Sequence, residues 1–85
     1  MKVNKNILRG GNTWLVTFED ENGKIKVVYE YEQNIFGVTK DVEKIAYTSE
    51  EEISDIVDKR FYTGIENMNE MQVKKILDTL EFIEI

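Results

Sequence analysis

The sequence contains no cysteine, no histidine and no proline among its 85 residues. Without cysteine the chain can form no disulfide, no thiolate nucleophile and no cysteine-based zinc site. Without histidine it also lacks the side chain that most often acts as a general base near neutral pH. Carboxylate pairs of the kind that hydrolyse glycosidic bonds remain, but 17 acidic residues guarantee such pairs by composition alone. We therefore predict a protein that is not an enzyme.

Long apolar runs are also missing. No segment approaches the length of a membrane-spanning helix, and the N-terminal residues lack the apolar block of a signal peptide. We expect a cytoplasmic protein without membrane contact. The length predicts a single α+β domain over residues 1–85 with one modest core. Alanine occurs only as Ala46, while Ile, Lys, Asn and Glu dominate, which is typical of an AT-rich bacterial or phage genome.

Negative charge is what the composition has in excess. The chain carries 17 acidic and 11 basic residues, for a net charge of −6. This field repels phosphate backbones, so we expect no direct nucleic-acid binding and instead a protein partner with a basic surface. The short, acidic, cysteine-free chain resembles in general type many phage-encoded inhibitors of host or defence proteins, anti-CRISPR proteins among them. That resemblance is one of size and charge.

The clearest local pattern is a β-hairpin over residues 13–32. Two alternating runs flank Asn22-Gly23, the dipeptide best suited to a two-residue type I′ turn. The turn sets Trp14 opposite Tyr31 and collects the large apolar rings on one face. A ladder of such rings can stack nucleic-acid bases, but here we expect it to form the core under the helices.

Further strands are expected on both sides of this hairpin. Gly10-Gly11 can reverse the chain after a strand at residues 3–8, in a register that sets Ile7 opposite Trp14 and Val3 opposite Phe18. The segment "QNIFGVTKD" (33–41) indicates a bend or bulge, and "VEKIAYT" a further strand. The tail "EFIEI" changes to β-branched and aromatic residues and predicts a last strand. The sheet should therefore be antiparallel, with three to five strands.

Two amphipathic helices follow in the second half of the chain. Ser49 and Glu52 form a capping-box pattern that opens a helix over about 50–63, with Gly64 as its C-terminal cap. Its apolar positions recur at helical spacing, at Ile53, Ile56, Val57 and Phe61. A second helix over about 70–80 begins with the capping-box pair Asn69 and Gln72. Both helices should pack on the aromatic face of the sheet.

The acidic run Glu50, Glu51 and Glu52 favours the start of a helix over a metal site. Carboxylates are stabilised at a helix N-terminus, and consecutive helical residues point about 100° apart. The ligand spacing of a calcium-binding loop is absent. We expect no metal and no cofactor.

A row of polar residues on the first predicted helix is the main candidate for a partner-binding site. Glu51, Asp55, Asp58 and Tyr62 recur at offsets of four, three and four, which places them on one stripe opposite the apolar face. The row could meet Arg and Lys of a partner and anchor with its tyrosine. The alternative is an ordinary solvated helix face.

Other residues are candidates for the same kind of contact. Arg60 falls near the middle of the apolar stripe and could pair with a carboxylate, or lay its stem on the edge of the core. Met71 is expected on the exposed side of the second helix. If the acidic stripe is not the contact, further candidates are the second hairpin face, with Leu15 and Val28, and the 33–41 loop, with Ile35 and Phe36.

The favoured hypothesis is a small acidic, non-catalytic protein-binding module of the phage-inhibitor type, either anti-CRISPR or directed against another host or defence protein. It would block a basic, nucleic-acid-handling partner by occupying the place of phosphates. One alternative is an immunity protein or antitoxin that neutralises a toxin. Another is a structural or oligomeric subunit of a phage or bacterial complex. We expect the isolated chain to be a monomer or homodimer.

Overall fold

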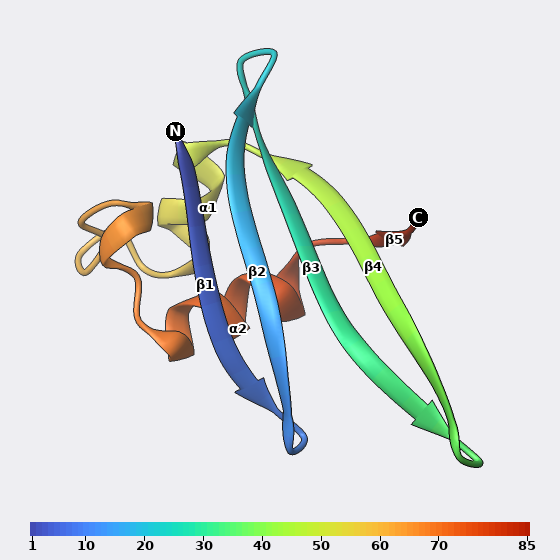
Figure 1. Cartoon of the computed structure of the whole chain (residues 1–85). Coiled ribbons are helices and arrows are strands. Elements are labelled where there is room, and N and C mark those ends of the chain that lie inside the picture. Colours follow the sequence, from blue (N-terminus) through green and yellow to red (C-terminus); the bar gives the residue numbers. More distant parts are fainter.

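A computed structural model describes all residues from 1 to 85 and shows an α+β fold, as the sequence predicts. Five antiparallel strands form one sheet in the order β1-β2-β3-β4-β5, and the helices lie together on one side of it (Figure 1). The strands are β1 (Lys2–Arg9), β2 (Asn12–Glu21), β3 (Lys24–Ile35), β4 (Val38–Thr48) and β5 (Ile83–Glu84). The helices are α1 (Glu50–Ile56), the short 3-10 helix η1 (Ile65–Asn67) and α2 (Glu70–Thr79).

The strand register follows from two-residue turns. Asn22-Gly23 joins β2 to β3 and sets Phe18 opposite Val27, as predicted. The Gly10-Gly11 turn sets Ile7 opposite Trp14, which also agrees with the prediction. The last residues of the chain form β5 against β4, so the expected closing strand is present.

The 33–41 segment differs from expectation. Instead of a bend or bulge it forms a third tight hairpin turn, in which Ile35 pairs with Val38 and Phe36-Gly37 reverses the chain. The β3–β4 ladder runs without interruption from Ile25–Thr48 to this turn. The turn could not be recognised from the sequence because phenylalanine is an unfavourable residue at its first position.

The ends of β3 and β4 project beyond the rest of the sheet (Figure 1). Pairing between β2 and β3 stops at Leu15–Glu30, whereas pairing between β3 and β4 continues for five more pairs. The two hairpins therefore diverge at this end of the molecule. We call the projecting two-stranded part, residues 32–41, the arm.

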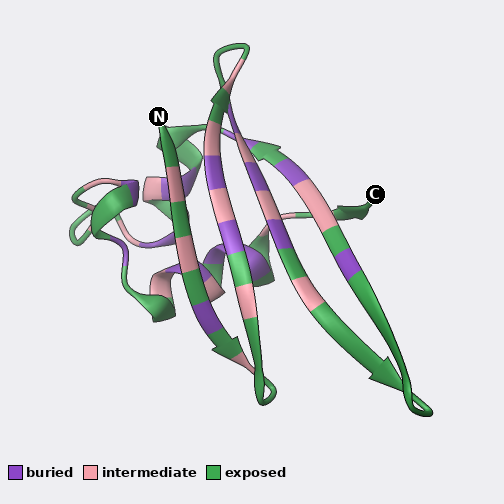
Figure 2. Cartoon of the chain, viewed as in Figure 1, coloured by how far each residue is buried: buried purple, intermediate pink, exposed green.

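The core lies between the helices and one face of the sheet. Buried positions alternate along the strands, as expected when only one face is covered (Figure 2). Thirteen buried residues form a single apolar cluster, to which β1, β2, β3, α1, α2 and the segment between the helices all contribute. The largest fully buried side chains are Phe18, Ile53, Ile76, Val16, Val27 and Val73.

The first helix is shorter than predicted, since it ends at Ile56 instead of continuing to residue 63. Asp58 takes a left-handed conformation with φ of 82°. Its carbonyl accepts from the amides of Phe61 and Tyr62, which closes a tight turn where the helix was expected to continue. Phe61 consequently points to solvent.

Other residues fill the core places that the shortened helix leaves. Ile65 and Met68, from the segment that leads to α2, are buried in the cluster. Gly64 is therefore not the cap of a long first helix. It has φ of 113° and immediately precedes η1, a backbone angle that favours glycine.

Both helices begin with the predicted capping residues. The Ser49 hydroxyl accepts from the Glu52 amide at 3.1 Å, but the Glu52 carboxylate accepts from the Thr48 hydroxyl at 2.8 Å and does not complete the box. At α2 the box is complete, because Asn69 and Gln72 each bond the other's backbone amide, at 2.9 and 3.0 Å. The run of three glutamates is therefore the first turn of α1, as predicted.

Polar contacts fasten β1 to the helical layer. The Lys5 ammonium donates to the carbonyls of Glu66 at 2.6 Å and Met68 at 3.1 Å. The Leu8 amide donates to the Glu70 carboxylate at 3.0 Å. This bond, together with Lys74 at 3.0 Å, lowers the pKa of Glu70. The outer edge of β1 is thus partly covered by the chain's own side chains.

A candidate protein-binding surface

The acidic stripe expected on the first helix does not exist as one continuous face. Asp58 lies beyond the end of α1, and its carboxylate binds the Arg60 guanidinium at 2.6 Å. This side-chain hydrogen bond holds the pKa of Asp58 below its usual value. Asp55 pairs with Lys59 at 3.2 Å. Two of the three carboxylates in the stripe are therefore already neutralised within the chain.

Tyr62 does not end the stripe as an exposed anchor. Its ring is half-buried against the core, and its hydroxyl donates to the Glu50 carboxylate at 2.7 Å. Burial, followed by the contact with Glu50, raises the pKa of this tyrosine. Of the predicted stripe, only Glu51 keeps a carboxylate that is exposed and unpaired.

Arg60 and Met71 are both at the surface. The Arg60 guanidinium lies over the Phe61 ring, 5.4 Å from its centroid, and is bound to Asp58. It is not placed in the apolar stripe, because the helix that would have put it there ends earlier. Met71 is exposed on α2, as predicted.

The denser group of carboxylates lies on the sheet. The face of the sheet that points away from the helices, which we call the open face, is uncovered (Figures 1 and 2). Strand alternation brings four carboxylates to this face on β3 and β4, where all four are exposed. We call them the carboxylate quartet: Glu30, Glu32, Asp41 and Glu43.

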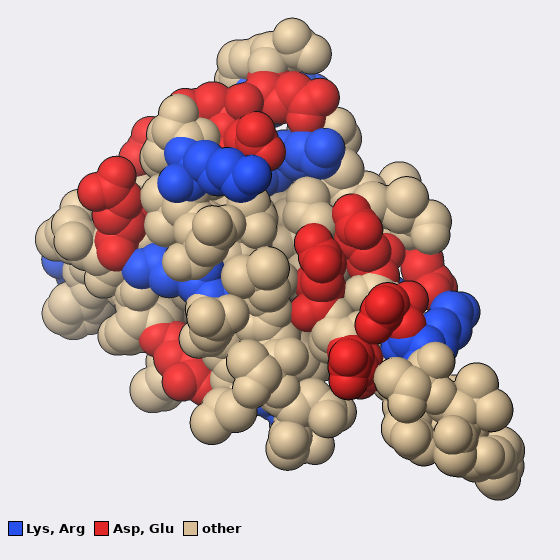
Figure 3. All heavy atoms as spheres, viewed as in Figure 1, with Lys and Arg blue, Asp and Glu red and all other residues tan.

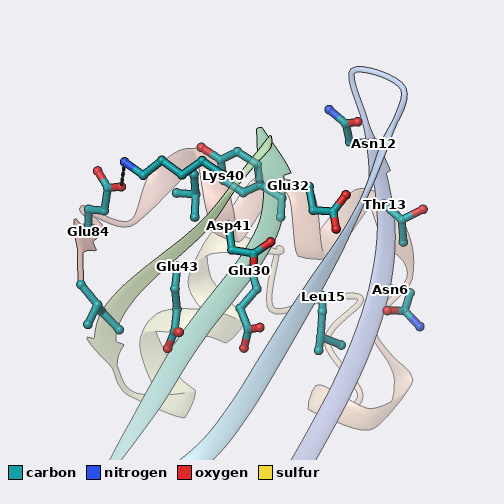
Figure 4. A pocket seen from close by; sticks show the side chains of 13 residues that line it. Asn6, Asn12, Thr13, Leu15, Glu30, Glu32, Lys40, Asp41, Glu43 and Glu84 are labelled. Carbon is teal, nitrogen blue, oxygen red and sulfur yellow. Dashed lines mark ion pairs between the residues drawn. The ribbon is translucent and has the colours of Figure 1, made fainter. Parts of the chain in front are cut away.

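The quartet consists of two like-charge pairs that face each other across the ladder. Glu30 is the direct cross-strand partner of Glu43, and Glu32 is the partner of Asp41. No Lys or Arg nitrogen lies within 4.0 Å of any of the four. Lys40, which precedes Asp41 in the chain, reaches Glu84 at 3.6 Å instead (Figure 4). Acidic atoms gather over this part of β3 and β4 in Figure 3.

A hollow opens beside the quartet where the two hairpins diverge. Its volume is about 750 Å³, and Figure 4 shows the side chains that surround it. One side is formed by residues of β1 and β2, including Thr13 and Leu15, and the other by the quartet. The lining is mainly polar, unlike the apolar pockets that enclose small molecules. The arrangement suits contact with another macromolecule's surface.

The quartet is spread along two strands and does not converge on a point. No group of three or more carboxylates comes together as a metal-binding cluster. Residues two apart on a strand are separated by about 6.6 Å, and neighbouring strands by about 4.8 Å. Four charges in this layout form a plane of negative potential.

The aromatic ladder predicted as core lies on the helical side of the sheet. The Trp14 ring stacks on Tyr31 at 4.2 Å and on Tyr29 at 5.0 Å between ring centroids, and Phe82 packs against Tyr29. Arg9 covers the Trp14 ring at 5.0 Å and pairs with Asp78 of α2 at 2.7 Å. The rings are thus occupied by contacts within the chain.

Sequence reasoning missed the quartet because its members are separated in the chain. Glu30 and Glu32 share one strand face, as do Asp41 and Glu43, and this much follows from alternation. That the two sets oppose each other depends on the Phe36-Gly37 turn, which fixes the register. Once the turn is known to have two residues, the pairing follows directly from the sequence.

No helix is long and apolar enough to cross a membrane. No protein-family model, curated protein or solved structure matches the chain, so the proposals below rest on its own geometry.

Proposed function

We propose that this protein is a non-catalytic binding module that presents the carboxylate quartet to a basic surface on a protein partner. The partner is one that handles nucleic acid, and the quartet takes the place of phosphates in its binding cleft. The observation that carries the proposal is the presence of two opposed like-charge pairs, Glu30–Glu43 and Glu32–Asp41, with no cation of the chain beside them.

The energetics of the sheet support a role beyond folding. Like charges placed directly opposite each other on neighbouring strands destabilise the sheet, whereas opposite charges there would stabilise it. The same sheet does contain opposite charges in this arrangement near the β2–β3 turn, where Glu19 faces Lys26 and Glu21 faces Lys24; Lys26 also lies 3.6 Å from Glu21 on the diagonal. Stability alone does not explain why the quartet lacks basic partners. A partner's Lys and Arg side chains would supply them on binding.

The layout of the charges favours a macromolecular partner over a single ion. An ion requires several oxygens within bonding distance of one point. The quartet instead offers its charges in two rows, so several side chains of a basic surface can engage it at once. Complementary charge of this kind accelerates association and is weakened by salt.

Affinity capture with matched variants tests the proposal. The quartet variant carries Glu30→Gln, Glu32→Gln, Asp41→Asn and Glu43→Gln, which changes the net charge from −6 to −2. The control carries the same number of neutralisations at acidic side chains that form no ion pair within the chain, Glu19, Glu51, Glu66 and Glu81, each changed to Gln.

We expect that a protein in a bacterial lysate is captured by the wild type and by the control, and that the quartet variant does not capture it. The wild type should also displace a fluorescent oligonucleotide from that purified protein. Equal capture by all three proteins would reject the quartet as the contact. A partner whose oligonucleotide is not displaced would reject the role as a substitute for phosphates.

A further inference from the structure

The end of the arm carries a group of exposed apolar side chains. Phe36 is fully exposed, and its neighbours Val38 and Ile35 are 69% and 51% exposed. We call these three residues the apolar tip. They lie at the end of a projecting hairpin (Figure 1), where no other element of the chain covers them. Exposed apolar residues grouped in this way indicate a contact surface more strongly than single ones do.

The turn beneath the tip is the same turn that the chain builds elsewhere from more suitable residues. The φ angles at Phe36-Gly37 are 52° and 80°, and those at Asn22-Gly23 are 51° and 78°. At Gly10-Gly11 they are 55° and 83°. Asparagine and glycine tolerate the left-handed angle at the first position, whereas a bulky phenylalanine is penalised there.

The Asn34 side chain accepts from the Gly37 amide at 3.2 Å, but the Phe36 ring makes no contact that offsets this penalty. A fully exposed ring packs against no neighbour, so Phe36 contributes no burial to the fold. The chain uses Asn or Gly where the turn only has to reverse a hairpin, and an aromatic residue only at the end of the arm. Residues held in unfavourable backbone angles cluster at functional sites.

We propose that the apolar tip is a hydrophobic anchor, in which Phe36 inserts into an apolar pocket of the partner beside the basic surface that the quartet contacts. The inference rests on the proposed function for the identity of the partner and adds a second contact to it. Aromatic side chains that enter a pocket commonly dominate the energy of a protein interface.

Charge selects a basic protein over other occupants of this site. The nearest carboxylates of the quartet, Glu32 and Asp41, are three residues from the tip, about 10 Å along the arm, so whatever binds the tip also meets negative charge. A second copy of the chain would bring its own net charge of −6 against it. An anionic membrane surface would be repelled in the same way.

The two sides of the arm differ in character. Alternation along the strands puts the quartet on the open face and directs Ile35 and Val38 to the opposite side. The arm therefore fits a cleft with one basic wall and one apolar wall. Clefts that hold single-stranded nucleic acid combine a basic groove with aromatic stacking surfaces. The quartet would contact the basic groove of such a cleft and the apolar tip its stacking surfaces.

Variants of two equivalent turns test the anchor. Phe36→Asn replaces a penalised residue with one that the turn favours, so the melting temperature should rise by about 4 to 8 °C. Affinity for the partner that the wild type captures should fall by about 10-fold or more. The control Asn22→Phe puts the same ring at the same φ in the other hairpin turn. It should lower the melting temperature and leave affinity within about twofold of the wild type.

The contributions of the anchor and of the quartet to affinity can be distinguished by how each depends on salt. Between about 50 and 200 mM NaCl, Phe36→Asn should lose affinity by a constant factor, because an apolar contact is little affected by screening. The quartet variant should lose its salt dependence instead. If the quartet variant binds like the wild type while Phe36→Asn does not, the proposed function fails and the anchor stands.

Several results would overturn the anchor. A lower melting temperature for Phe36→Asn would show that Phe36 supports the fold, and this measurement needs no partner. Unchanged affinity of Phe36→Asn would remove the tip from the interface. Dimerisation of the wild type that Phe36→Asn abolishes, seen by sedimentation equilibrium, would assign the tip to a second copy. Phe36-dependent cosedimentation with phosphatidylcholine or phosphatidylglycerol vesicles would assign it to lipid.

Discussion

Glu30 on β3 and Glu43 on β4 are direct cross-strand partners on the open face of the sheet, with no basic side chain of the chain in ion-pair contact with either. The next pair on the same face towards the arm's end, Glu32 and Asp41, repeats the relationship. Repulsion at two successive positions is a cost that the folded chain carries alone. A cationic surface bound to this face would relieve that repulsion, which is what the proposed function requires.

Removal of one carboxylate from each pair should stabilise the protein. Asp41→Asn with Glu43→Gln removes both repulsions, and we expect a gain of about 0.2 to 1 kcal/mol for each pair in urea unfolding. Glu66→Gln with Glu81→Gln makes the same change in net charge at sites outside both α-helices and without an opposed carboxylate. An equal gain in this control would show that overall charge, and not the facing pairs, destabilises the fold.

The β2–β3 turn should tolerate no β-branched residue at its second position. A Cβ at Gly23 would meet no atom within 4 Å, so Gly23→Val introduces no clash. Its φ of 78° is nevertheless unfavourable for valine, and we expect a loss of at least about 1 to 2 kcal/mol in stability. An unchanged melting temperature in calorimetry would contradict the turn geometry.

The two helix caps should differ in their importance. Ser49→Ala removes a single bond to the Glu52 amide, and Asn69→Ala disrupts a reciprocal pair with Gln72. We expect each to cost about 0.5 to 2 kcal/mol in urea unfolding, with the larger loss at Asn69. A larger loss at Ser49 would be inconsistent with the incomplete box at α1.

Glu70 should make the stability of the folded protein depend on pH. The Leu8 amide and Lys74 hold its pKa below the usual 4.5 in the folded protein. The folded state therefore binds a proton less readily than the unfolded state, and the stability from Glu70 is present above pH 4.5 and lost as pH falls through the lowered value. Glu70→Gln should lower the free energy of unfolding near neutral pH. It should also make that free energy fall less steeply as the pH is lowered below 4.5. Identical profiles for variant and wild type would refute this coupling.

Much of the fold is predictable from local sequence rules. Asn22-Gly23 and Gly10-Gly11 each determine a hairpin, and their registers agree with the alternation of apolar residues. The cap of α2 was equally clear, since Asn69 and Gln72 form a complete box. Where turn chemistry and hydrophobic pattern agree, the sequence is sufficient to predict the element and its register.

The end of α1 could not be predicted, because helical periodicity continues past it. Ile53 and Val57 are buried as expected, but Asp58 turns the chain in a left-handed conformation that aspartate tolerates without a distinctive signal. Ile65 and Met68 then take the core positions that periodicity assigned further along the helix. The predicted acidic stripe was lost with the helix that should have carried it.

The candidate site was missed for a related reason. Phe36 violates the residue preference of its turn, so the third hairpin was not recognised and the carboxylates of β3 and β4 were not placed opposite each other. The segment with Ile35 and Phe36 was a candidate contact from sequence alone, as was the face with Leu15 and Val28. Departures from local rules are expected at functional sites, since binding and folding make different demands there.

The most direct test of the account is the salt dependence of binding between the captured partner and three proteins: the wild type, the quartet variant and its charge-matched control. Between about 50 and 200 mM NaCl, wild type and control should lose affinity steeply and in parallel. The quartet variant should bind at least about 10-fold more weakly at the lower salt, with a much flatter dependence. If the quartet variant and the control instead bind the partner equally more weakly than the wild type does at the lower salt, overall charge explains the binding and the facing carboxylates are not its site.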